Sequence, residues 1–145
     1  MGHRSIVFVA FTVALAGCSA QPPHGEMAHG GPAADAKPVL YDSLGNYSYP
    51  VTASPEAQRW FDQGLRLVYG FNHYEARKAF REAARLDPRC AMCFWGIAMT
   101  EGSNYNSPTD TDREQRALEA VLVAHERAAR ATPVERAISA KRRAS

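Results

Sequence analysis

The sequence predicts an all-α protein built from antiparallel helical hairpins. From residue 54 onward, apolar residues recur at steps of three and four, which is the period of an amphipathic helix. Short breaks rich in Pro, Gly, Asn and Asp separate these runs, and no segment shows the two-residue alternation of a half-buried strand. The chain has 145 residues, 46% of them hydrophobic, which is enough for one small domain with a core.

The first hairpin is predicted to begin at Ser54-Pro55-Glu56, because Ser caps helices well and Pro suits the first helical position. Two amphipathic runs follow and are joined by a turn near residues 70–73. The second run ends at Asp87-Pro88, since the residue before a proline is pushed out of the α region. The apolar positions of the two runs are Trp60, Gly64, Leu67, Val68 and Phe71, then Ala76, Ala79, Phe80, Ala83 and Leu86.

A second hairpin is predicted from a run that starts around Arg89 and is broken by Gly and Asn over residues 102–106. The next run follows Ser107-Pro108-Thr109-Asp110, where we expect Ser107 to be the N-cap. A last helix begins at Thr132-Pro133-Val134-Glu135, a full capping box with proline at its first position. The positions that carry the two middle runs are Phe94, Ile97, Ala98 and Glu101, then Ala117, Leu118, Val121, Leu122, Ala124 and Ala128.

The N-terminus predicts a targeting segment over residues 1–17. Arg4 precedes an apolar run that is too short to span a bilayer as a mature helix, and the run closes in Leu15-Ala16-Gly17-Cys18. That ending resembles the bacterial lipobox. The resemblance implies cleavage before Cys18, lipidation of Cys18 and, with Ser19 next, sorting to the outer membrane facing the periplasm. The alternative is an unlipidated secretory peptide with a chance cysteine.

Residues 18–53 are predicted to be a flexible tether followed by an irregular lead-in, and residues 54–145 the helical domain. The tether is rich in Pro, Gly and Ala. It carries His24, Met27 and His29, soft ligands that suit copper-like metals, although a plain spacer is the simpler interpretation. In the lead-in we expect tyrosines to pack onto the first helix.

Six residues of the first hairpin repeat a known spacing. Steps of 4, 12, 4, 3 and 5 separate them in chain order. This pattern resembles the tetratricopeptide repeat (TPR), placing one repeat at residues 57–90 and a second, with an insertion, up to residue 131. The resemblance implies that six residues determine how two helices pack and where the second one ends: Trp60, Gly64, Ala76, Phe80, Ala83 and Pro88. Gln63 and Leu67 depart from the usual Leu and Tyr.

A narrower resemblance is carried by FDQGLRLVYGFNHYEARKAF, LDPRCAMCFWGIAM and NYN. These stretches look like the N-terminal part of a group of long bacterial TPR proteins, and this resemblance implies no particular activity. Because solenoids need about three repeats and a polar cap, we expect the chain to be a truncated part of a longer solenoid. If it is not, a partner or a second copy is expected to cover its last helix.

Cys90 and Cys93 allow four interpretations. Covalent haem requires His after the second cysteine, where Phe94 stands, and a thioredoxin-like site requires a preceding strand. Zinc requires two further ligands, for which His73 and His125 are candidates. The favoured interpretation is a seam between hairpins, either bridged by a local disulfide or occupied by two small buried thiols.

Function is predicted at the level of class. Stacked hairpins form a concave surface that binds a protein or peptide, with helix-face residues such as Arg59, Arg66 and Asn72. The alternative is a metal- or thiol-handling protein that uses Cys90 and Cys93 with His73 or the tether.

If the inserted loop folds over the first hairpin, a polar pocket could be lined by His73, Glu75, Asn104 and Asn106. No catalytic set or phosphate loop is present, so neither an enzyme nor a cofactor is predicted. The formal charge of +2 is interspersed, which argues against nucleic-acid binding.

Overall fold

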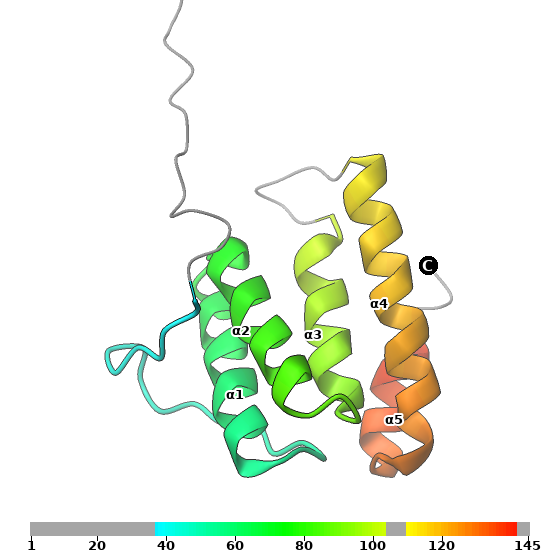
Figure 1. Ribbon diagram of the computed structural model, residues 1–145, viewed down its shortest axis with the longest axis horizontal. Helices are drawn as coiled ribbons and strands as arrows, with labels where there is room; N and C mark the ends of the chain where they lie inside the picture. Colours follow the sequence, from blue (N-terminus) through cyan, green and yellow to red (C-terminus); the bar gives the residue numbers. More distant parts are fainter. Residues whose placement is uncertain (1–36, 104–109, 142–145) are drawn as a thin grey trace, which may run out of the picture. The chain divides into compact units, whose positions relative to one another are not determined.

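Five α-helices and one 3-10 turn make up the part of the chain that the structure, a computed structural model, describes: residues 37–103 and 110–141 (Figure 1). No strand occurs in these residues, so the all-α prediction is confirmed. The chain divides between residues 35 and 36 into two units, and every described residue belongs to the second. The elements are α1 (Pro55–Tyr69), α2 (His73–Leu86), α3 (Ala91–Glu101), α4 (Thr111–Arg127), η1 (Ala128–Arg130) and α5 (Pro133–Lys141).

The first hairpin begins and ends where the sequence predicts. Ser54 Oγ accepts a hydrogen bond of 3.3 Å from Ala57 N at the start of α1, and α2 ends at Leu86, before Asp87 and Pro88. In the turn, Phe71 has a positive φ of 59°, a position that usually holds glycine. Asn72 then caps α2 through its side-chain oxygen, which accepts from Glu75 N.

The second hairpin follows the predicted runs, with a later start at its first helix and a different cap at its second. Helix α3 starts at Ala91, with Cys90 as its N-cap, and α4 starts at Thr111. The prediction of Ser107 as the cap of α4 is wrong, because the Asp110 carboxylate accepts the hydrogen bond of 2.8 Å from Arg113 N. An aspartate is as good an N-cap as a serine, and the spacing to the apolar stripe did not distinguish the two.

The lead-in lies along α1 through hydrogen bonds between its backbone and buried polar side chains. Asp62 accepts from Ser48 Oγ (2.7 Å), Tyr49 N (3.1 Å) and Gln58 Nε2 (2.8 Å). Gln63 accepts from Tyr41 N and donates to Val39 O, both at 2.8 Å. These contacts explain how an irregular segment is held on one helix face without secondary structure of its own.

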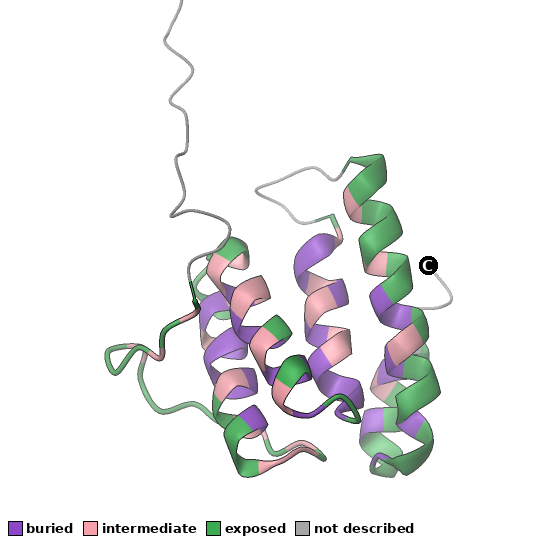
Figure 2. Ribbon diagram, in the orientation of Figure 1, coloured by how far each residue is buried: buried purple, intermediate pink, exposed green. Residues whose placement is uncertain are grey.

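Helix α3 is the centre of the bundle. It contacts each of the other four α-helices, and its sequence is apolar on nearly all sides, as a helix surrounded by others requires. Burial follows this arrangement: α3 is mostly buried or half-buried, whereas α4 is exposed over much of its length (Figure 2). No described helix combines the length and the apolar composition needed to cross a bilayer.

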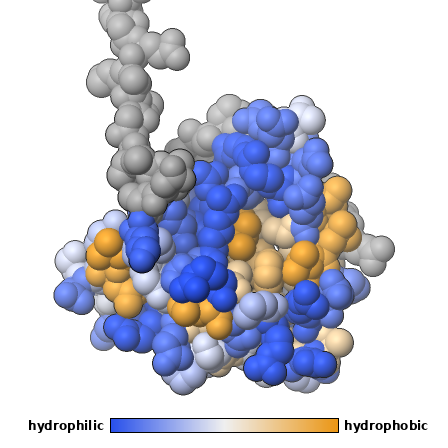
Figure 3. Space-filling view, viewed as in Figure 1, coloured by the Kyte–Doolittle hydropathy of each residue, from blue (hydrophilic) through white to orange (hydrophobic). Residues whose placement is uncertain are grey.

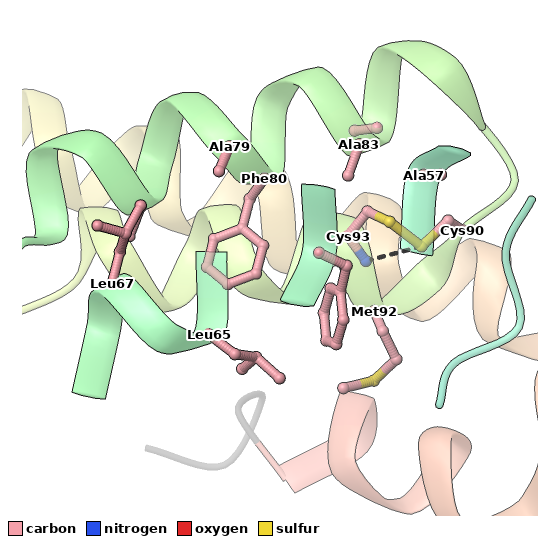
Figure 4. Close-up of a cluster of buried hydrophobic side chains, with 12 residues drawn as sticks. Ala57, Leu65, Leu67, Ala79, Phe80, Ala83, Cys90, Met92 and Cys93 are labelled. Atoms are coloured by element: carbon pink, nitrogen blue, oxygen red, sulfur yellow. Dashed lines mark hydrogen bonds between the residues drawn. A yellow bond between two sulfur atoms is a disulfide. The ribbon is translucent and has the colours of Figure 1, made fainter. Parts of the chain in front are cut away.

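The side chain of Phe80 on α2 occupies the space that α1 and α3 leave open at two glycines. A Cβ atom at Gly64 would lie 2.5 Å from Phe80 Cε1, and one at Gly96 would overlap Cδ1 of the same ring. Phe80 is fully buried, and its ring centroid lies 5.5 Å from that of Phe61 (Figure 4). The three helices therefore meet around one aromatic ring.

Replacing either glycine by alanine should destabilise the protein. Helix propensity alone would favour Ala by about 1 kcal/mol, but overpacking a closed core costs about 1–3 kcal/mol, and here the ring has no room to move. We expect Gly64→Ala and Gly96→Ala to lower the net free energy of unfolding by up to about 2 kcal/mol, measured by urea denaturation. The matched control is Gly70→Ala, whose Cβ would meet nothing closer than 3.4 Å. Equal stability of Gly64→Ala and Gly70→Ala would contradict this packing.

Candidate functional site

An apolar groove of about 290 Å³ lies where the lead-in and three helices meet. Helix α1 supplies Phe61, Leu65 and Tyr69 at steps of four, so the three side chains share one face. The remaining lining residues come from the lead-in, α3 and α5: Tyr47, Tyr49, Met92, Trp95 and Ile138. The volume is at the small end of ligand pockets, which suits one or two side chains rather than a large cofactor.

The rim of the groove is aromatic. The rings of Tyr47 and Tyr69 meet edge to face, with centroids 5.6 Å apart, and both residues are exposed. A hydrogen bond with Tyr69 is the largest of the effects that raise the pKa of the Tyr47 hydroxyl, so this phenol is neutral at physiological pH. Amphipathic rings of this kind are enriched at protein interfaces.

The residues that carry the predicted repeat spacing lie in and beside the core. Ala76, Phe80 and Ala83 are fully buried, Gly64 is buried against Phe80, and Trp60 is half-buried. Pro88 is exposed and follows the end of α2. Of the expected helix-face residues, Arg66 donates to Tyr47 O at 2.7 Å, Asn72 caps α2, and neither lines the apolar groove.

Cys90 and Cys93 form a disulfide, with their sulfur atoms 2.02 Å apart. Both residues are fully buried, and Cys90 Sγ also accepts a hydrogen bond of 3.1 Å from Cys93 N (Figure 4). The bridge closes the first turn of α3, at the seam between the two hairpins. The bridged form of the seam interpretation is therefore the one the structure contains.

The structure describes only some of the residues of the predicted polar pocket and metal sites. His73 is the first residue of α2, with Nδ1 3.3 Å from Phe71 O, and Glu75 pairs with Lys78 at 3.0 Å. Asn104, Asn106, Cys18, His24, Met27 and His29 lie outside the described residues. Within residues 37–103 and 110–141, no group of three His, Cys, Asp or Glu side chains could hold a metal ion. The metal- or thiol-handling alternative remains a prediction.

A buried carboxylate surrounded by arginines is the main feature that sequence reasoning missed. Glu101, the last residue of α3, is fully buried. Arg81 Nη2 lies 2.9 Å and Arg77 Nη1 3.2 Å from its oxygens, both from α2. From α4, Arg116 Nε lies at 3.3 Å and Arg113 Nε at 4.0 Å. One carboxylate thus joins the three helices; we call these five residues the Glu101 cluster.

The sequence holds a signal for this cluster. Arg77 and Arg81 are four residues apart, so they lie on one face of α2, and Arg113 and Arg116 lie on one face of α4. A single acid at the end of an apolar run, between two such arginine pairs, is the pattern of a shared ion pair. The pairing itself depends on the packing of α2, α3 and α4, which spacing along the chain does not specify.

A second buried carboxylate anchors α5 to the lead-in. Glu135 completes the predicted capping box, since Thr132 N donates to it at 2.8 Å and Glu135 N donates to Thr132 Oγ1 at 3.3 Å. It also accepts from Thr52 N and Thr52 Oγ1, both at 2.7 Å. Burial on its own would raise the pKa of Glu135, but the hydrogen bonds from Thr52 and Thr132 outweigh it and hold that pKa below its ordinary value.

Comparison with protein-family models, with curated proteins and with solved structures finds no match to this chain. The TPR and lipobox resemblances therefore rest on the residues quoted for them above.

Replacing Glu101 by glutamine should destabilise the bundle, because it removes the negative charge that pairs with the arginines of α2 and α4. Removing one partner of a buried ion pair costs about 3–5 kcal/mol, and we expect about 2–4 kcal/mol here because two of the arginines are half exposed. The measurement is urea unfolding of Glu101→Gln beside Glu126→Gln, an exposed acid that pairs with its neighbour Arg127. The control should change by less than about 0.5 kcal/mol. Similar losses in the two variants would show that the Glu101 cluster does not stabilise the fold.

Glu135→Gln should lower stability by about 1–3 kcal/mol at neutral pH, because hydrogen bonds to a charged group are lost. The folded-state pKa of Glu135 is depressed, so its contribution is present above the unfolded pKa of about 4.3 and is lost as pH falls through the folded value. The difference in unfolding free energy between wild type and Glu135→Gln should accordingly shrink between pH 6 and pH 3. Glu56→Gln, an exposed first-turn acid of α1, is the control and should show a smaller change.

Proposed function

We propose that the chain is a lipid-anchored protein-binding module of the bacterial cell envelope, with helical hairpins of the TPR type. The observation that carries this proposal is the apolar groove, whose walls come from α1, α3, α5 and the lead-in. Aromatic and Met side chains dominate its lining, the residue types that supply most of the energy at protein interfaces. A peptide that places an apolar or aromatic side chain in the groove is the partner that this lining favours.

The arrangement of the helices supports the TPR type. The odd-numbered helices contact one another in order, α1 with α3 and α3 with α5, and α1 and α3 each pair with the following helix. In stacked hairpins the first helices of successive repeats line one surface. The groove residues of α1, α3 and α5 lie on such a surface, so the partner would contact three successive hairpin starts.

The envelope location rests on the lipobox resemblance at Cys18, with support from the disulfide. Bonds of this kind form and persist in oxidising compartments such as the bacterial periplasm. Cys18 then carries lipid, while Cys90 and Cys93 pair with each other. This division accounts for all three cysteines of the chain.

The test is a selection of random peptides on the immobilised protein, followed by affinity measurements. We expect enriched peptides to carry an aromatic or large aliphatic residue, and Tyr69→Ala and Trp95→Ala to weaken their binding by about tenfold, or 1.4 kcal/mol. The matched control is Phe71→Ala, because Phe71 is as exposed as Tyr69 (69% against 65%) but does not line the groove. No enriched peptide, or equal losses in all three variants, would refute binding in the groove.

A further inference from the structure

We infer that the Glu101 cluster forms an oxyanion site between α2 and α4, in which Arg81 and Arg116 bind a carboxylate or phosphate group. This site lies apart from the apolar groove and goes beyond the proposed function. Glu101 and the groove residues Met92 and Trp95 belong to different faces of α3: Glu101 reaches α2 and α4, whereas Met92 and Trp95 meet α1, α5 and the lead-in. A ligand at the cluster would leave the groove free.

The arginines of the Glu101 cluster carry more hydrogen-bond donors than the Glu101 carboxylate can accept. One carboxylate offers about four lone-pair positions, whereas each guanidinium carries five N–H donors. Arg77 and Arg81 each donate one hydrogen bond to Glu101, at 3.2 and 2.9 Å, so most of the remaining donors do not point to this acid. The side chains of Arg81 and Arg116 are 53% and 43% exposed, which leaves their outer edges open to solvent.

Glu101 also fixes the positions of the two half-exposed arginines, Arg81 and Arg116. Arg81 lies 2.9 Å from one oxygen of Glu101 and Arg116 lies 3.3 Å from the other, so both guanidinium groups contact the same carboxylate although they come from different helices. The buried carboxylate therefore holds one half-exposed fork from each of the two helices. Planar forks that are fixed in this way match the geometry of carboxylate and phosphate oxygens and lose little freedom on binding.

The charged residues around Arg81 and Arg116 leave the cluster positively charged. On α2, the neighbours of Arg81 one turn away are Arg77 and Arg85, and Arg85 is paired with Glu82 at 2.6 Å. On α4, Asp112 and Glu119 lie one turn to either side of Arg116 and are exposed. Within the Glu101 cluster itself, Arg77, Arg81, Arg113 and Arg116 surround a single carboxylate, so the cluster carries a net positive charge, which favours an anion.

The surroundings suit a ligand that arrives on a larger molecule. In the space-filling view, hydrophilic surface over α2 and the start of α4 borders a recess where hydrophobic atoms gather over α3 and α4 (Figure 3). Leu118 and Leu122, one turn apart on α4, are exposed. An acidic side chain of a protein partner would come with further atoms that contact this apolar surface, whereas a free phosphate would contact the arginines alone. The experiment distinguishes these two sources of the oxyanion.

The experiment is a titration of the full-length mature protein, followed by NMR of the arginine Nε–H groups at low salt. The probes are inorganic phosphate and an N-acetylated hexaglutamate peptide. We expect saturable shifts at Arg81 and Arg116, with a Kd at least tenfold higher for the double variant Arg81→Gln/Arg116→Gln. The matched control, Arg85→Gln/Arg127→Gln, removes the same charge from the same two helices and should change the Kd less than twofold.

Each outcome decides the proposal or the source of the ligand. Tighter binding of the peptide than of phosphate, with competition between them, assigns the site to an acidic partner segment; binding of phosphate alone assigns it to a free anion. Absence of saturable shifts in the wild type, or equal losses in the two double variants, would overturn the site. Arg81→Lys/Arg116→Lys keeps the charge and guards against unfolding of the Gln variant; it should still weaken binding severalfold, because the planar forks are lost.

Discussion

The position of one aromatic ring, that of Phe80, controls how closely the two hairpins approach. The ring from α2 fits between α1 and α3 only because both neighbours present a glycine, Gly64 and Gly96. Any side chain at either position would push a helix outward. Because α3 contacts every other α-helix, a shift of α3 at this point would move α4 and α5 as well.

Both candidate sites depend on this central helix. Met92 and Trp95 on α3 form part of the apolar groove, and Glu101 at the end of the same helix holds the arginines of α2 and α4. The disulfide of Cys90 and Cys93 fixes the first turn of α3, next to Met92. The packing around Phe80 thus sets the groove on one face of α3 and the charged cluster on another.

The sequence predicted those features that depend on neighbours along the chain. The caps at Ser54 and Thr132 and the helix stop before Pro88 follow from local backbone chemistry, and each was predicted correctly. Two features that depend on contacts between distant segments were not predicted. Thr52 and Glu135 are 83 residues apart, and Glu101 meets Arg77 and Arg113 only after three helices have packed. Periodicity correctly placed Glu101 in the buried run of α3, but it gave no reason for an acid there.

A buried acid at the end of α3 costs free energy unless cations pair with it. A negative charge in the last turn of a helix opposes the helix dipole, and burying it adds a desolvation penalty, so Glu101 would destabilise α3 by itself. An apolar residue of similar size would pack without either cost. The four arginines offset this cost only when α2 and α4 both pack against the end of α3, because the carboxylate would otherwise be buried without a partner. We interpret the cluster as a device that holds the two hairpins together at this end of α3, and the half-exposed forks of Arg81 and Arg116 are the surplus charge that it presents to solvent.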